Sequence, residues 1–197
     1  MSEIYLAGGC FWGVEKAISL LDGVVSTECG YANGDPSLIP DYLLVCSGRY
    51  GYAETVRVVY DPERIGLEKI LKAFFMVIDP TLVNRQGNDI GIQYRTGIYW
   101  ADDDSAEKVR KFVSRISDSY PEFHTELMPL SNFTKAEDKH QKYLDNNPMG
   151  YCHISRAVMD EISRMRCPHS DAHRSFCIGH RTENMHSGVG PDVHFGT

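Results

Sequence analysis

The sequence is short of paired cysteines and of positive charge. Its six cysteines, at positions 10, 29, 46, 152, 167 and 177, contain no CxxC pair and are too sparse in 197 residues for a secreted disulfide scaffold. Twenty basic residues against 27 acidic residues leave a formal net charge of −7. This balance excludes the basic surface that nucleic acid or anionic lipid would need, so we expect neither as a partner.

Long apolar runs are also missing. No run approaches the ~20 residues of a membrane span, and no basic segment followed by an apolar core opens the sequence. We therefore expect an untargeted cytoplasmic protein with no membrane partner, and we expect it to be a monomer. The cysteines would then be available for redox or nucleophilic chemistry in a reducing compartment.

The most informative stretch is GGCFWGVE at residues 8–15. It joins a short apolar run at 4–7 to a segment whose apolar residues recur at helical spacing, which predicts a strand, a tight glycine turn and a helix. Cys10 then begins the helix, where unpaired N–H groups and partial positive charge stabilise a thiolate and lower the pKa of the thiol. We interpret Cys10 as a nucleophile. The alternative is a buried structural cysteine.

A second candidate, Glu54, lies on a strand predicted over 52–60. Alternation places Glu54 on the same face as Val56, Val58 and Tyr60. If that face meets the core, the carboxyl is desolvated and its pKa is raised, which suits a proton donor near neutral pH. The alternative is a glutamate at a strand end in solvent.

The other elements follow from periodicity and capping residues. Strands are predicted over 24–31, 94–100 and 124–128, and helices over 67–78, 102–116 and 134–146. A capping box of Thr134 and Glu137, with Phe133 as a hydrophobic staple, would open the last helix. The polar segments 33–50 and 81–93 are predicted to be loops. Helices alternating with strands over about 155 residues indicate a layered α/β or α+β domain with one mixed sheet.

Beyond residue 160 the character of the sequence changes. Apolar periodicity fades, and five of the eight histidines lie there. We predict a domain over 1–159 and a loosely structured tail over 160–197. Cys167, His169, His173 and Cys177 form a Cys/His set, for which zinc binding and a further thiol relay are open alternatives.

Four ordered blocks resemble the A-type peptide methionine sulfoxide reductases. They are GCFWGVE at 9–15, CSG at 46–48 with GYAE at 51–54, RQGNDIGIQYR at 85–95, and NPMGYCHI at 147–154. The resemblance implies an α+β, two-layer α/β sandwich of ferredoxin-like type and a catalytic reductase domain over 1–159. It also implies an oxidoreductase that reduces the S epimer of methionine sulfoxide, free or in proteins, without a cofactor or metal.

Residue types in these blocks suit the reaction. Cys10 is a soft nucleophile for sulfur, Glu54 can supply a proton to the departing oxygen, and the phenols of Tyr42 and Tyr94 can hydrogen-bond that oxygen. Attack would leave Cys10 as a sulfenic acid. By resemblance, Cys152 is the resolving cysteine, and thioredoxin is the partner that reduces the resulting disulfide.

Three further residues complete the candidate site. Phe11 and Trp12 offer aromatic faces to the S-methyl group, because sulfur and aromatic rings attract by ~0.3–1.5 kcal/mol. Asp89 would order its loop or a water molecule. The sequence departs from the family pattern in two places: Tyr52 replaces the usual histidine before Ala-Glu, and no second cysteine follows soon after Cys152.

Two alternatives to the reductase hypothesis stay open. A cysteine hydrolase would need a histidine beside the thiol, and none of the candidates His124, His140 and His153 lies in the block that contains Cys10. A redox or zinc-binding module built on the tail is the non-enzymatic alternative. Of the remaining cysteines, Cys29 is predicted to be core and Cys46 to be structural.

Overall fold

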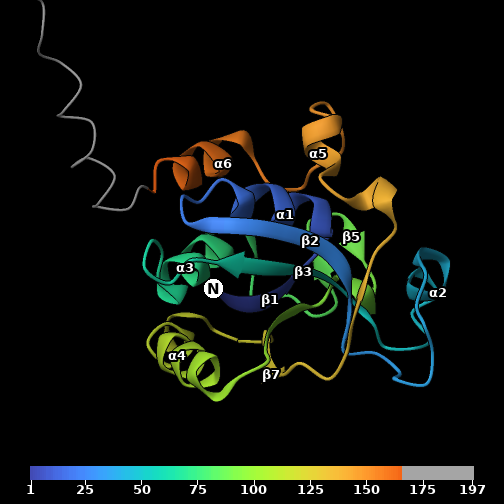
Figure 1. Ribbon diagram of the computed structural model, residues 1–197. Helices are drawn as coiled ribbons and strands as arrows, with labels where there is room; N and C mark the ends of the chain where they lie inside the picture. The colour runs from blue at the N-terminus through green and yellow to red at the C-terminus, as the bar shows by residue number, and fades with distance from the viewer. Residues whose placement is uncertain (166–197) are drawn as a thin grey trace, which may run out of the picture. The chain divides into compact units, whose positions relative to one another are not determined.

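A six-stranded mixed sheet organises the described part of the computed structural model, residues 1–165 (Figure 1). Its strands are β1 (Ser2–Gly8), β2 (Val24–Ala32), β3 (Ala53–Tyr60), β6 (Thr96–Trp100), β7 (Glu126–Pro129) and β8 (Phe133–Lys135). They are ordered β7-β6-β1-β3-β2-β8. Only the β6–β7 pair is parallel among these strands. Strand β1, which leads into the turn with Cys10, and strand β3, which carries Glu54, are therefore central neighbours.

Helices cover one face of this sheet. The larger ones are α1 (Phe11–Ser19), α3 (Leu67–Val77), α4 (Asp103–Ser114) and α6 (Arg156–Ser163). Helix α3 contacts α1, α4 and α6, and the buried side chains of these helices join Ile4, Leu6, Val56 and Val58 of the central strands in one core. A smaller cluster around Tyr5 and Tyr99 lies apart from this core. The predicted two-layer α+β architecture with one mixed sheet is confirmed.

The chain passes directly from a central strand into the first helix. Gly9 turns it there with φ +80, and Cys10 is the N-cap of α1. A Cβ on Gly9 would lie 2.6 Å from the Gln86 side chain, so only glycine suits both this backbone conformation and this contact. The predicted strand, glycine turn and helix are confirmed, and they place Cys10 at one end of the two middle strands.

The segments predicted to be loops contain short elements. Residues 33–50 include α2 (Tyr42–Cys46), whose N-cap Asp41 accepts a hydrogen bond from the Leu44 N–H. Residues 81–93 fold into a hairpin of β4 (Arg85–Gln86) and β5 (Asp89–Ile90), followed by the 3-10 turn η1 (Ile92–Tyr94). The Gln86 amide exchanges two hydrogen bonds of 2.8 Å with the Asp79 backbone, which fastens the hairpin to the end of α3.

The predicted helix over 134–146 is wrong. Phe133–Lys135 forms β8 on the edge of β2, with Thr134 opposite Tyr31. The 3-10 turn η3 (Asp138–His140) and the one-turn helix α5 (Tyr143–Asn146) follow, separated by Lys142 in a left-handed conformation, φ 50. The edge of β2 offered backbone hydrogen bonds to residues 133–135, and tertiary pairing overrode the local capping signal.

The expected start of the tail also differs. Helix α6 crosses the boundary between residues 159 and 160, and Ile162 is fully buried in the core. The rest of the tail, including Cys167, His169, His173 and Cys177, lies outside the described residues. No helix within residues 1–165 has the length and apolar character needed to cross a membrane.

The burial of Ile162 predicts that α6 is part of the folded domain and contributes to its stability. Replacing Ile162 with Ala should lower the free energy of unfolding by about 2–5 kcal/mol, because a buried aliphatic side chain is lost and a cavity remains. Glu161→Ala, on the exposed side of the same helix, should change it by less than about 0.5 kcal/mol. Urea unfolding measures both. Equal small effects would place α6 outside the core.

Candidate active site

Cys10 lies at the start of α1 and is 8% exposed. Burial raises the pKa of its thiol, and the negative charge of Glu54 raises it further, while a backbone hydrogen bond from Trp12 opposes both. The expectation of a resting thiolate is therefore wrong for the free protein. Desolvation outweighs the partial charge of the helix end, so Cys10 is a neutral thiol at neutral pH.

Glu54 faces the core from β3, as alternation predicted, and is 2% exposed. Its carboxylate oxygen accepts a hydrogen bond of 3.1 Å from the Phe11 N–H, the residue next to Cys10. Burial raises the pKa of Glu54 to about 8; the Phe11 N–H opposes this rise, and the charge of Asp89 adds to it. The carboxyl is therefore largely protonated at neutral pH and sits beside the thiol.

Two phenols share this environment. Tyr42 reaches it from α2 and Tyr94 from η1, and in both the charges of Glu54 and Cys10 raise the pKa of the hydroxyl. For Tyr42 the largest cause is a side-chain hydrogen bond with Cys46, whereas for Tyr94 it is burial. Both hydroxyls therefore remain protonated and can donate a hydrogen bond to an oxygen held near the thiol.

Asp89 enters the site from the β4–β5 hairpin. Its carboxylate accepts a hydrogen bond of 3.1 Å from the Tyr151 hydroxyl, and it lies 3.8 Å from Nδ1 of His153. Its negative charge raises the pKa of both Cys10 and Glu54. The hairpin thus connects the third sequence block with the fourth.

The two aromatic residues after Cys10 have different surroundings. Phe11 is 2% exposed and packs among Tyr31 and His140, with ring centroids 5.9 and 5.3 Å away. Trp12 is partly exposed and stacks on Tyr143, with centroids 3.8 Å apart and an interplanar angle of 16°. Phe11 is therefore a buried support, and Trp12 is the ring of this pair that a ligand can reach more readily.

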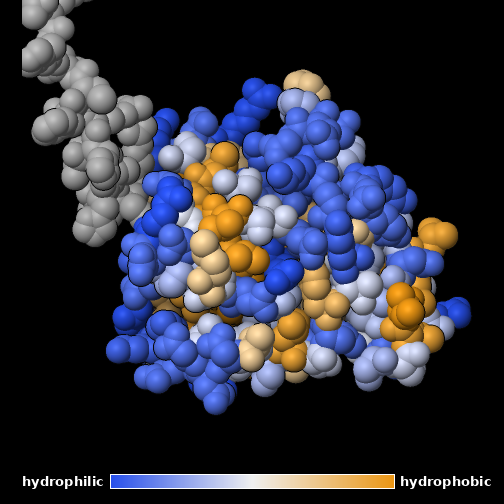
Figure 2. Space-filling view, viewed as in Figure 1, coloured by the Kyte–Doolittle hydropathy of each residue, from blue (hydrophilic) through white to orange (hydrophobic). Residues whose placement is uncertain are grey.

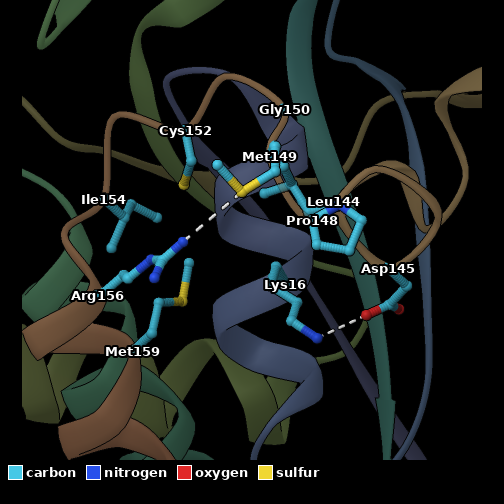
Figure 3. A pocket seen from close by; sticks show the side chains of 10 residues that line it. All are labelled: Lys16, Leu144, Asp145, Pro148, Met149, Gly150, Cys152, Ile154, Arg156 and Met159. Atoms are coloured by element: carbon cyan, nitrogen blue, oxygen red, sulfur yellow. Dashed lines mark hydrogen bonds and ion pairs between the residues drawn. The ribbon is translucent and has the colours of Figure 1, made fainter.

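Cys152 packs against α1 beside the first turn. A Cβ on Gly13 would lie 3.4 Å from its sulfur, and Gly13 is three residues after Cys10. Cys152 is a half-buried free thiol. Figure 3 shows its sulfur pointing into a cavity of about 470 Å³ that also contacts Met149, Arg156 and Met159. The two candidate redox cysteines therefore both lie beside the first turn of α1, and Cys152 faces an open cavity.

Acidic side chains anchor the irregular segments around this site. Glu137 accepts hydrogen bonds from the Tyr31 hydroxyl at 2.8 Å and from the Tyr42 N–H at 2.9 Å, which fixes the start of α2. Glu15 is 3% exposed and accepts the Lys142 N–H at 2.8 Å, which places α5 and its Tyr143 against Trp12.

Several of these residues escaped the sequence analysis. Glu137 was assigned to a capping box, and His140, Tyr143, Tyr151 and His153 received no role at the site. In the structure His140 packs against Phe11, and the His153 ring lies beside the Cys10 turn. The fourth block was the available signal, since Tyr151 and His153 flank Cys152 directly.

The other singled-out residues have plain structural positions. Cys29 is fully buried, as predicted, while Cys46 is exposed at the end of α2. Tyr52 donates a hydrogen bond from its hydroxyl to the Asp35 carbonyl at 2.6 Å, so it ties down the loop before α2. Within residues 1–165, no group of three or more His, Cys, Asp or Glu side chains is placed to hold a metal ion.

The surface beside Tyr42 is apolar. Leu38, Ile39 and Leu43 expose 36%, 88% and 78% of their area. Apolar side chains gather on the right of Figure 2, where Figure 1 places α2. A ligand larger than one amino acid could contact this surface while its end lies near Cys10.

A neutral thiol, a protonated carboxyl and two phenols around one position form an arrangement suited to thiol chemistry on an oxygen-bearing group. The family model for peptide methionine sulfoxide reductase matches residues 2–170. A peptide methionine sulfoxide reductase MsrA of Clostridium acetobutylicum is 47% identical over 81% of this chain and 98% of its own. The chain therefore belongs to the peptide methionine sulfoxide reductase family, whose members are oxidoreductases.

Solved structures show the same fold. Reduced Mxr1 of Saccharomyces cerevisiae is 37% identical, with a TM-score of 0.74 over 78% of this chain and 90% of that one. Mxr1 in complex with Trx2 aligns with a TM-score of 0.51 at 26% identity, covering 72% of this chain and 83% of that one.

The placement of Glu54 beside Cys10 predicts how the thiol reacts with alkylating agents. Above about pH 8 the carboxyl is ionised and raises the thiol pKa, so Glu54→Gln should speed alkylation of Cys10 several-fold there. Below pH 7 the carboxyl is already neutral, and the two proteins should differ much less. Peptide-resolved mass spectrometry after timed iodoacetamide treatment measures the rate. The control is Glu122→Gln, which changes an exposed carboxyl. If the unaltered protein, Glu54→Gln and Glu122→Gln were alkylated at the same rate at pH 9, the predicted effect of Glu54 on the Cys10 thiol would be excluded.

Proposed function

We propose that this protein reduces methionine S-sulfoxide, free or within proteins, by a thiol mechanism centred on Cys10. The observation that carries the proposal is the buried Cys10 thiol beside a buried carboxyl whose pKa is raised to about 8. A sulfoxide oxygen becomes a leaving group only when protonated, and Glu54 holds a proton at neutral pH. The apolar surface beside Tyr42 supports a protein-bound substrate.

The first step transfers oxygen from the substrate to Cys10. Glu54 gives its proton to the sulfoxide oxygen while the Cys10 sulfur bonds to the substrate sulfur, and the proton of the Cys10 thiol restores the carboxyl. The S–S bond then breaks as the hydroxyl passes from the substrate sulfur to the Cys10 sulfur. The substrate sulfur is reduced to a thioether and Cys10 is oxidised to a sulfenic acid. Tyr42 and Tyr94 donate hydrogen bonds to the oxygen as negative charge develops on it. Trp12 provides an aromatic face for the S-methyl group, with Phe11 supporting it from beneath.

The second half of the cycle uses Cys152. Its thiol attacks the Cys10 sulfenic acid, water leaves, and a Cys10–Cys152 disulfide forms. Cys152 is suited to this role because it packs on the same end of α1 and opens onto a cavity. Thioredoxin is the proposed reductant of that disulfide, and the Mxr1–Trx2 complex of a related protein supports this choice. Such a cycle needs a reducing compartment, which is consistent with the predicted cytoplasmic location. That the protein is a monomer stays a separate prediction.

Cysteine variants test the proposal directly. Cys10→Ser should abolish loss of sulfoxide, because the nucleophile is removed. Cys152→Ser should produce about one methionine per protein and then stop with thioredoxin as reductant, because the sulfenic acid is not resolved. Product analysis separating the two sulfoxide epimers, with thiols counted before and after, measures both. Cys29→Ser serves as a control for folding, and sustained turnover by either active-site variant would exclude its assigned role.

The role of Glu54 has its own pH signature. The rate of the first step should fall as pH rises through about 8, because the carboxyl loses the proton it must donate. Glu54→Gln should slow that step by about 10²–10⁴-fold and lose this dependence. Single-turnover formation of methionine between pH 6 and 9 distinguishes the cases. An unchanged rate in the variant would show that the proton comes from another group.

A further inference from the structure

We propose that His153, paired with Asp89, is an acid–base group for the resolving step, and that it takes the proton of Cys152 as that thiol attacks oxidised Cys10. The inference rests on the function proposed above and adds a residue that the two-cysteine cycle does not use. It starts from a buried imidazole that lacks partners and lies against the turn carrying Cys10.

The His153 side chain is buried although its polar ring nitrogens are unpaired within the described part of the chain. Its side chain is 7% exposed, and neither ring nitrogen has a hydrogen-bond partner among residues 1–165. The nearest charged group is the Asp89 carboxylate, 3.8 Å from Nδ1, which is too long for a hydrogen bond. Burying unpaired polar nitrogens costs free energy, and native proteins satisfy nearly all such atoms. An imidazole left in this state is suited to a partner that arrives during the reaction.

The ring lies between the parts of the site that carry the reacting groups. Its Cε1 is 3.3 Å from the position of a Cβ on Gly9 and 3.4 Å from that of a Cβ on Gly13, the glycines on either side of the Cys10 turn. On the other side, its Cβ is 3.2 Å from the corresponding position at Gly87 in the hairpin. The imidazole therefore fills the space between the start of α1 and the hairpin that bears Asp89.

Cys152 shares this location. Its sulfur also lies 3.4 Å from the position of a Gly13 Cβ, so the thiol and the imidazole both pack against Gly13 of α1. This contact depends on Gly13, since any larger residue there would push both groups away. Cys152 and His153 are consecutive residues, and both pack against the start of α1. This packing brings a base close to the place where the disulfide would form.

The electrostatics support a base in this position. Burial lowers the pKa of His153, and the charge of Asp89 opposes that effect, so the ring is neutral at pH 7 and can accept a proton. Burial raises the pKa of the Cys152 thiol, while a backbone hydrogen bond from Ile154 opposes it. The charged group beside the ring is Asp89, which also accepts the Tyr151 hydroxyl, and the ring packs against the turn that carries the titratable thiol of Cys10. A thiol with a raised pKa needs a base to attack at neutral pH.

The proposed step balances. The Cys152 sulfur bonds to the Cys10 sulfur as the S–O bond of the sulfenic acid breaks. The Cys152 proton passes to the imidazole, whose positive charge Asp89 stabilises. The imidazolium then gives the proton to the leaving hydroxide, so water and a disulfide are the products, and His153 is restored. Cys10 is reduced from the sulfenic acid level and Cys152 is oxidised, without an external oxidant.

The test compares the two steps in one protein. His153→Gln keeps side-chain size but removes the base. It should slow disulfide formation at least ~10²-fold more than it slows the single-turnover burst of methionine. His124→Gln, an exposed histidine paired with Glu122, is the matched control and should change neither step. Rapid quench with mass spectrometry follows methionine, sulfenic acid and disulfide separately. If both steps slow by the same factor, or disulfide formation keeps its rate, the inference is overturned.

Two further measurements test the role of His153 if His153→Gln is unstable. In the unaltered protein, disulfide formation should lose rate on acidification with an inflection below 6.5, the ordinary value for histidine. An inflection only near or above 9, where a thiol titrates by itself, would overturn the inference. In His153→Ala, added imidazole should restore disulfide formation, and no restoration counts against it. Absence of a methionine burst in the unaltered protein would instead refute the proposed function.

Discussion

The hydrogen bond from the Phe11 N–H to the Glu54 carboxylate is the contact on which the site depends. It joins the first turn of α1 to the central strand β3 and uses one of the N–H groups that a helix start leaves unpaired. Because both partners are buried, the carboxyl is held where water cannot stabilise its charge, and its pKa rises to about 8. This contact therefore holds the carboxyl beside the turn that carries Cys10, while burial, which the Phe11 N–H opposes, keeps the carboxyl protonated.

The other segments of the site are held by hydrogen bonds between side chains and the backbone, because strand pairing does not fix them. The Gln86 amide fastens the hairpin that carries Asp89, and the Gln141 amide makes three hydrogen bonds of 2.9 Å to the backbone of Cys29 and Ala136. Glu15 and Glu137 add anchors to α5 and α2. These segments have little regular structure of their own, so buried polar contacts, which are costly to break singly, position their candidate site residues.

The resting protein keeps its chemistry inactive. The Cys10 thiol and the Glu54 carboxyl are both neutral at pH 7 because burial opposes either charge. In the proposed cycle, a substrate oxygen that receives the carboxyl proton leaves Glu54 ionised, and this carboxylate can then accept the proton of the Cys10 thiol. The proposed cycle thus couples activation of the Cys10 nucleophile to occupation of the site and avoids an exposed thiolate open to unproductive oxidation.

The sequence by itself determined the strand, turn and helix around Cys10 and the placement of Glu54 on the apolar face of its strand, because these follow from local periodicity. The α+β class followed from long, specific motifs shared with a known family. The sequence did not determine the helix content of 134–146, where the free edge of β2 captured residues 133–135. Nor could it show that Cys10 is a neutral thiol, that His140 packs against Phe11, or that the His153 ring lies beside the Cys10 turn. Burial, and contacts between residues 100 or more positions apart, decided those features, and both exist only once the chain has folded.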